Sequence, residues 1–170
     1  MKLNIGGEQK KEGWKILNIQ ENDYVDFVGD ISDLTQFEDN TIEEIYASHI
    51  LEHVIIREVP ETLKGIYRIL KNNGKFYVSV PDMDILCRIF MSSEAPMRAK
   101  LHAIKMMFGG QMDKFDYHYF GWNYDILEKY LREAGFKNIE KVKFFDLFDD
   151  TSNYAPYNDV PISLNVIAYK

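Results

Sequence analysis

Three of the four histidines in this chain stand beside carboxylates or phenols, in patterns that could carry chemistry. Residues 49–53 spell His-x-x-Glu-His, and on a helix the two imidazoles would share one face and could hold a metal ion. Such a site needs a long helix and a further ligand, whereas here the pattern falls between a predicted strand and a helix that begins near Pro60. We therefore expect no metal site, with His53 packing at the strand end and His49 lining a cleft. A zinc metallopeptidase is the remote alternative.

Three side chains are candidates for a catalytic acid or base. His118 lies in the run Asp116-Tyr117-His118-Tyr119, and an unperturbed imidazole titrates near neutral pH, as a general base requires. The alternative for His118 is a hydrogen-bonded structural histidine. His49 and Asp82 are the other two candidates, and Asp82 also fits the N-cap of a helix that starts at Met83.

A second group of residues could bind a ligand, because each follows a short apolar run that we interpret as a strand. Glycines in this group would let the backbone approach a ligand closely, while carboxylate, amide and hydroxyl groups could hydrogen-bond to it. Asp30 could instead cap a turn through Ser32, and Glu21 could be a solvated charge. The candidates are Gly6, Gly7, Gln20, Glu21, Asp30, Ile31 and Ser48.

The elements that must position these residues alternate between strands and helices. Apolar runs predict strands at residues 3–5, 16–19, 25–28, 42–47 and 76–80, with later ones at 139–145 and 164–169. Between the fourth and fifth runs, helical spacing from Pro60 to Lys71 predicts a crossover helix that stops before Gly74. Further helices are expected at 84–90 and 123–134, the latter capped by Asn123 and closed by Gly135.

A strand–helix–strand unit implies parallel strands joined by a right-handed crossover. We therefore expect an α/β fold with a Rossmann-like, doubly wound, mostly parallel sheet of about seven strands, whose last strand is antiparallel. The first connections are shorter than the roughly 10 to 12 residues that a helical crossover needs. The first crossover helix is accordingly expected to be short or missing, which leaves one face of the sheet poorly covered.

Seven stretches in this order resemble the class I S-adenosylmethionine-dependent methyltransferases, and most closely a group of short predicted methyltransferases. They are residues 3–7, 28–31, 37–41, 48–54, 67–74, 80–82 and 134–136. The resemblance implies S-adenosylmethionine as the cofactor, with Gly6 and Gly7 in the cofactor turn. It also implies that Asp30 and Ile31 contact the adenine. A third glycine is absent after Gly7, and Gln20 stands where the family has an acid, so a non-catalytic module without cofactor binding is the main alternative.

Composition limits the remaining choices. With 170 residues, a net charge of −7 and one cysteine, the chain reads as one domain, 1–170, in a reducing cytoplasmic setting. We expect no nucleic-acid partner, because basic clusters are lacking, and no membrane partner. The expected reaction is methyl transfer to a small-molecule or carbohydrate acceptor. The methionine- and aromatic-rich segment 91–124 is expected to be an insertion that forms either a lid or an extra packing layer, or a homodimer contact. The acidic connection 146–159 is expected to be a solvated loop, unless Tyr154, Pro156 and Tyr157 fold it over the cleft.

Overall fold

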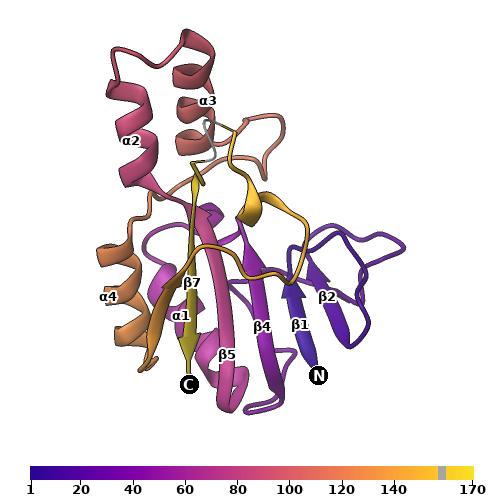
Figure 1. Cartoon of the computed structure of the whole chain (residues 1–170). Coiled ribbons are helices and arrows are strands. Elements are labelled where there is room, and N and C mark those ends of the chain that lie inside the picture. The colour runs from indigo at the N-terminus through magenta and orange to yellow at the C-terminus, as the bar shows by residue number, and fades with distance from the viewer. Residues whose placement is uncertain (157–159) are drawn as a thin grey trace.

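The computed structural model describes residues 1–156 and 160–170, and within these residues one seven-stranded sheet forms the centre of the molecule (Figure 1). The strand order is β3-β2-β1-β4-β5-β7-β6. This order, with helical cover, confirms the expected Rossmann-like α/β fold. The strands are β1 (Lys2–Ile5), β2 (Trp14–Asn18), β3 (Phe27–Val28), β4 (Ile42–Ser48), β5 (Leu70–Pro81), β6 (Ile139–Val142) and β7 (Ser163–Tyr169).

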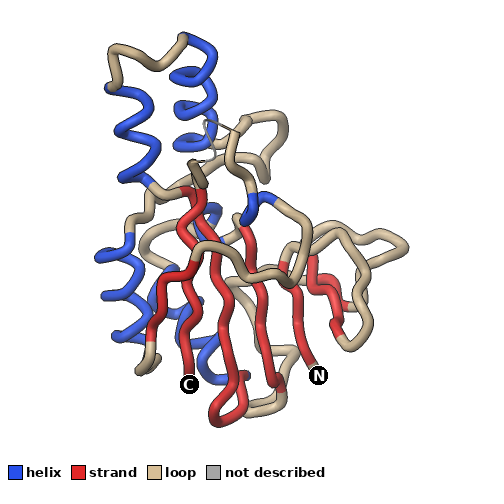
Figure 2. The backbone as a smooth tube through the Cα atoms, in the orientation of Figure 1, coloured by secondary structure: helices blue, strands red, loops and turns tan. Residues whose placement is uncertain are grey.

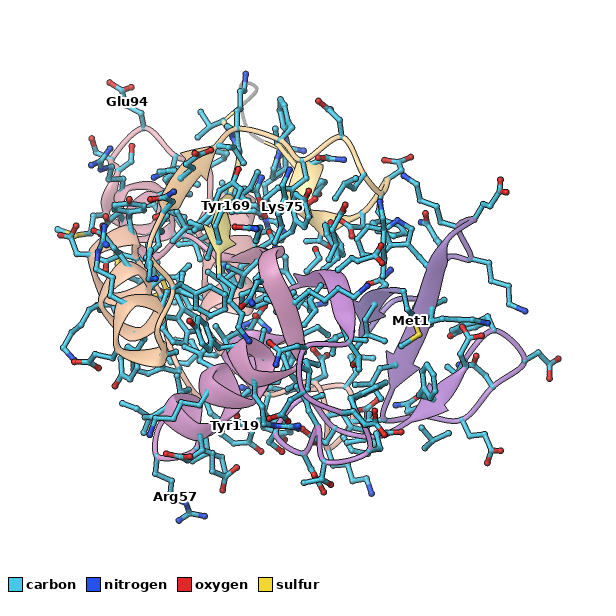
Figure 3. The ribbon with its side chains drawn as sticks, turned by 90° about the horizontal axis from the view of Figure 1, so that it is seen from below. Met1, Arg57, Lys75, Glu94, Tyr119 and Tyr169 are labelled. Carbon is cyan, nitrogen blue, oxygen red and sulfur yellow. The ribbon has the colours of Figure 1, made fainter. Side chains whose placement is uncertain are left out.

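The strand directions bring several strand ends to one edge of the sheet. β1 pairs in parallel with β2 and β4, β2 pairs in parallel with β3, and β4 pairs in parallel with β5. β7 is antiparallel to both β5 and β6, which confirms the expected antiparallel last strand. Lys75 and Tyr169 therefore lie side by side, with the lysine Nζ 5.7 Å from the tyrosine ring centroid (Figure 3). The carboxyl ends of β1 to β5 share the edge where open α/β sheets bind ligands.

The crossover helix α1 (Val59–Ile69) connects β4 to β5 and has Pro60 in its first turn, as expected. It buries Leu63 and Ile66 against the sheet. The prediction that Lys71 belongs to its last turn was wrong, because β5 begins directly at Leu70. The backbone N–H groups of residues 40 and 41 donate to the carbonyls of residues 68 and 69 at 3.0 and 2.9 Å, so the helix end is satisfied without a further turn.

The two faces of the sheet are covered differently. Helices α1 and α4 (Tyr124–Ala134) pack on one face, and α4 has the predicted Asn123 cap and a left-handed Gly135 at its end. The connections 6–13 and 19–26 contain no helix, as the sequence spacing predicted, and the longer connection 29–41 contains none either. The opposite face is covered by the connection between β6 and β7, which crosses in front of the sheet (Figure 2). On this face, side chains from the strands and from the connection form one aromatic cluster, which consists of Trp14, Tyr46, Tyr77, Phe145 and Phe148.

Beyond the end of β5, the chain forms a hairpin of two helices, α2 (Met83–Met91) and α3 (Met97–Phe108), that projects past the strand ends (Figure 1). Leu86 and Ala103 meet Ile162 between these helices, with Met106 and Met107 packed beside them. A coil, residues 109–123, then returns to α4. Among the described helices, none has the length and hydropathy required to cross a membrane.

Candidate functional site

A cavity of about 410 Å³ opens at the carboxyl ends of β1, β2 and β3. Its volume falls in the range of roughly 300 to 1,000 Å³ that is usual for small-molecule sites. Four of the candidate ligand-binding residues line it together: Gly6, Gln20, Asp30 and Ile31. Glu21 does not line it, so the structure does not bring that carboxylate to the other candidates.

Gly6 ends β1 in a conformation that favours glycine, with φ of +75°. Its N–H donates to the Leu17 carbonyl at 2.7 Å, which ties the turn to β2. A Cβ atom at Gly6 would lie 2.0 Å from Cδ1 of Ile50, and one at Gly7 would lie 2.3 Å from the Asn4 amide nitrogen. A side chain at either glycine would therefore displace a neighbouring side chain, and at Gly6 it would also have to adopt the positive φ. The backbone of Gly6 lines the cavity.

Asp30 and Ile31 follow β3 on the far wall of this cavity. The Oδ1 atom of Asp30 accepts hydrogen bonds from both the N–H and the hydroxyl of Ser32, each at 2.8 Å, so the turn-capping interpretation of Asp30 is confirmed. Both bonds use the same oxygen. No hydrogen bond from a described residue reaches Oδ2, so this second oxygen is available to a ligand. Ile31 is 5% exposed and offers its side chain as a flat apolar wall.

The coil 109–123 forms the opposite rim, through Lys114, Phe115 and Tyr119. The backbone N–H of Tyr119 donates to the Glu52 carbonyl at 2.8 Å (Tyr119 is labelled in Figure 3). This bond fixes the coil against the short 3₁₀ helix η1 (Leu51–His53) that follows β4. Within segment 91–124, helix α3 packs against α2, whereas the coil 109–123 borders the cavity.

A second cavity of about 300 Å³ lies beyond the glycine turn and shares Ile5, Gly6, Glu8 and Ile50 with the first. Three candidate residues line only this cavity: Gly7, Ser48 and His49. Asp150 and Thr151 line it from the connection between β6 and β7. The glycine turn and Ile50 therefore form the boundary between two adjoining spaces.

Asp150 anchors that connection to the sheet, so the prediction of a solvated loop was wrong at this residue. Its carboxylate accepts hydrogen bonds from the Tyr46 hydroxyl at 2.8 Å, the Ser48 hydroxyl at 3.2 Å and the Ser152 N–H at 2.9 Å. Burial raises the pKa of Tyr46 well above its usual value, which keeps the phenol protonated as a donor. Tyr157, also named in the loop-closing hypothesis, and Asp159 lie outside the described residues.

The three catalytic candidates have different surroundings. Asp82 is 2% exposed, accepts from the Asp84 N–H at 3.1 Å as an N-cap, and lies 3.4 Å from Lys141 Nζ. The Nδ1 atom of His118 donates to the Met106 carbonyl at 2.9 Å, and burial lowers the pKa of its imidazole. Neither Asp82 nor His118 lines either cavity, whereas His49 lines the second one.

The helix-face arrangement considered for His49 and His53 does not form. His49 has a positive φ of 54° and turns the chain between β4 and η1, which contains only residues 51–53. Instead, Glu52 becomes fully buried and is approached by His49 Nδ1 at 3.2 Å and His118 Nε2 at 4.0 Å. Burial raises the pKa of Glu52, but the contact with His49 and the charges of the three histidines outweigh it, and the net pKa is lowered. The sequence pattern contained Glu52 and His53, but nothing in their spacing indicated that His118 would join them.

The family model described as a methyltransferase domain matches residues 5–78, which run from the end of β1 into β5 and include the glycine turn, Asp30 and η1. Among curated protein sequences, none matches this chain.

Solved structures share the fold over nearly the whole chain. A SAM-dependent methyltransferase from Archaeoglobus fulgidus matches with a TM-score of 0.65 and 17% identity, over 99% of this chain and 85% of that one. A 1,6-didemethyltoxoflavin-N1-methyltransferase from Burkholderia thailandensis, with bound 1,6-didemethyltoxoflavin and S-adenosylhomocysteine, matches with 0.61 and 16%, over 99% and 69%. The human N-acetylserotonin methyltransferase in complex with SAM matches with 0.53 and 16%, over 93% and 41%. At these identities the likeness establishes the fold.

Proposed function

We propose that this protein methylates a small-molecule or glycan acceptor with S-adenosylmethionine as the methyl donor. The proposal is supported by the match of residues 5–78 to the methyltransferase-domain model and by the fold that the chain shares with S-adenosylmethionine-dependent methyltransferases. The observation that carries the proposal is the convergence of Gly6, Gln20, Asp30 and Ile31 on one nucleoside-sized cavity. The small-molecule acceptor is supported by the B. thailandensis neighbour, which holds 1,6-didemethyltoxoflavin.

The residues of the first cavity fit the nucleoside part of this cofactor. Oδ2 of Asp30 can accept a hydrogen bond from the adenine amino group, and the Ile31 side chain can lie against the ring. The Gln20 amide can hydrogen-bond to a ribose hydroxyl, although without the extra strength of a charge-assisted bond. The bare backbone at Gly6 leaves room for the chain of the cofactor to pass toward the second cavity.

We assign the second cavity to the acceptor, because it adjoins the first across the glycine turn. Its polar groups suit a hydroxylated molecule: the Asp150 carboxylate and the Ser48 hydroxyl can both orient an acceptor hydroxyl. Of the three catalytic candidates we retain His49, since it is the one that lines this space. The net charge of −7 and the acidic Asp150 favour a neutral or cationic acceptor over an anionic one.

The reaction rests on alignment of the two reactants. When bound, S-adenosylmethionine supplies a sulfonium methyl group: an acceptor oxygen or nitrogen forms a bond to its carbon, the electrons of the broken C–S bond remain on sulfur, and the acceptor proton leaves to a base or water. The chain contributes by holding the acceptor through Ser48 and Asp150 in line with the donor, which can supply a large part of the rate enhancement. Phe115 and Tyr119, on the coil that borders the first cavity, help to exclude water.

Calorimetric titration with S-adenosylhomocysteine tests this proposal, with a matched pair of aspartate variants. Asp30→Asn keeps the turn cap but places an amide donor toward the adenine amino group, so we expect affinity to fall about tenfold, equivalent to about 1.4 kcal/mol. Asp33→Asn is the control, because Asp33 caps the next turn in the same way, accepting from the Thr35 N–H and hydroxyl at 3.1 and 2.7 Å, and lines neither cavity. Absence of binding at millimolar ligand would favour the non-catalytic module, and equal losses in both variants would contradict the assigned adenine position.

A further inference from the structure

We propose that Glu52, His53 and His118 form a binding site for a divalent transition-metal ion beside the first cavity. One ligand atom from each of these three side chains lies within 4.8 Å of the others. Glu52 and His53 come from η1, whereas His118 comes from the coil 109–123, so the fold brings together groups more than sixty residues apart. The rings of His53 and His118 meet edge to face, with centroids 4.7 Å apart.

The hydrogen bonds of both histidines prepare them as ligands. His53 Nδ1 bonds to the Tyr117 carbonyl at 3.0 Å, and His118 Nδ1 bonds to the Met106 carbonyl at 2.9 Å. A carbonyl oxygen can only accept, so each Nδ1 must carry the hydrogen. In the neutral imidazole Nε2 then carries a lone pair, and in His118 this atom faces the Glu52 carboxylate. A second partner that fixes the tautomer in this way is the usual arrangement around metal-bound histidine.

His49 repeats this pattern from the other side of the carboxylate. Its Nε2 lies 2.8 Å from the Ser163 hydroxyl, and that hydroxyl donates its own hydrogen to the Thr151 carbonyl at 2.9 Å. The serine oxygen must therefore accept from His49 Nε2, and His49 Nδ1 lies 3.2 Å from a carboxylate oxygen of Glu52. We assign His49 as a positioning residue that holds the carboxylate.

The carboxylate of Glu52 requires a cation. Glu52 is fully buried, and within the described residues neither of its oxygens has a hydrogen-bond partner. An uncompensated buried carboxylate is costly, and the nearest basic groups are the imidazoles of His49 and His118, at 3.2 and 4.0 Å. A metal ion bound between the carboxylate and the two Nε2 atoms would satisfy all of them at once.

The donor set selects the kind of ion. Two imidazoles and one carboxylate suit zinc, iron, cobalt, nickel or manganese, whereas magnesium prefers oxygen ligands. Three protein ligands leave a coordination position open, as in catalytic metal sites. His53 and Tyr119 line the first cavity, so that position would be reachable by a bound molecule. A role for the ion in orienting the methyl acceptor rests on the proposed function, whereas metal binding itself does not.

Cobalt titration of the chelator-treated protein tests the site with a readout independent of activity. We expect one Co²⁺ per chain, a ligand-field absorption in the visible range, and displacement of cobalt by zinc but not by magnesium. Loss of even a second-sphere partner typically lowers metal affinity 10- to 100-fold, so His118→Gln and Glu52→Gln should weaken binding by about 100-fold or more. His102→Gln is the matched control, because His102 is the one histidine of the sequence outside this cluster, and it should bind as the wild type does.

Circular dichroism and thermal melting establish that each variant folds, and His53→Gln provides a third ligand variant if Glu52→Gln does not fold. The proposal is overturned if the wild type binds neither Co²⁺ nor Zn²⁺, or if His118→Gln and His102→Gln bind alike. Wild-type protein without metal affinity would mean that protonated histidines neutralise Glu52. Binding of S-adenosylhomocysteine by the chelator-treated protein is measured in parallel, so that failure of the metal site is distinguished from failure of the proposed methyl transfer.

Discussion

Replacing Gly6 with alanine should damage both the stability of the protein and its affinity for the cofactor. The backbone at this position has φ of +75°, and a non-glycine residue in that region costs about 1 to 2 kcal/mol. In a protein of this size, that cost lowers the melting temperature by about 2 to 8 °C. The effect on binding has a separate cause. The new Cβ would lie 2.0 Å from Ile50 Cδ1, so the Ile50 side chain, which lines both cavities, would have to move.

Gly65→Ala is the matched control for this experiment. Gly65 lies inside α1, and the atom nearest to a Cβ there is Leu34 Cδ1, at an ordinary contact distance of 3.8 Å. Alanine is the better helix former, so this variant should gain about 0.5 to 1 kcal/mol and bind the cofactor normally.

Urea denaturation followed by circular dichroism measures the stability of the two glycine variants, and calorimetric titration with S-adenosylhomocysteine measures their affinity. We expect Gly6→Ala to lose at least about tenfold in affinity, equivalent to about 1.4 kcal/mol. If Gly6→Ala matches the wild type in both measurements, the geometry assigned to the glycine turn is refuted. If it loses stability alone, the turn is structural and the cavity assignment is refuted.

Three further predictions concern the elements around the site. Tyr46→Phe removes the hydroxyl that donates to Asp150, so we expect a loss of about 1.5 to 3 kcal/mol in urea denaturation and faster proteolysis within residues 143–156; an unchanged cleavage rate would contradict the anchoring role. Asn123→Ala should cost about 1 kcal/mol through loss of the α4 cap, whereas Asn123→Ser should largely retain it, and equal stability of the two variants would exclude capping. Burial raises the pKa of Tyr77 to about 12, from about 10 in the unfolded chain, so the stability present below pH 10 should be lost as the pH rises toward 12. Urea midpoints over this range should fall less steeply for Tyr77→Phe, and identical slopes would disprove the assignment.

The sheet could be predicted from the sequence because its signals are local. Apolar runs, the helix with Pro60 in its first turn and the Asn123 cap each occupy a few consecutive residues, and the structure contains all of them. The short early connections also predicted correctly that no crossover helix follows β1. The end of α1 was misplaced, because its last carbonyls are satisfied by residues 40 and 41, which a local pattern does not reveal.

The site was only partly predictable, because long-range contacts decide it. Gly6, Gln20, Asp30 and Ile31 follow strands, so the rule for parallel sheets placed them at one edge. Asp150 and His118 come from irregular connections whose paths depend on tertiary packing, and no sequence period indicates where such segments return. Asp150 therefore looked like a solvated charge, whereas it anchors a loop. For His118 the sequence left a base and a hydrogen-bonded structural histidine open, and neither pattern indicated that it would face Glu52.

A crystal structure of the protein with S-adenosylhomocysteine would show whether the first cavity binds the nucleoside of the cofactor. We expect the adenine ring against the Ile31 side chain, with its amino group within hydrogen-bond distance of Asp30 and the cofactor chain passing over Gly6. The assigned cofactor site is contradicted if the nucleoside binds elsewhere. It is also contradicted if both cavities are empty in clear density at a saturating ligand concentration.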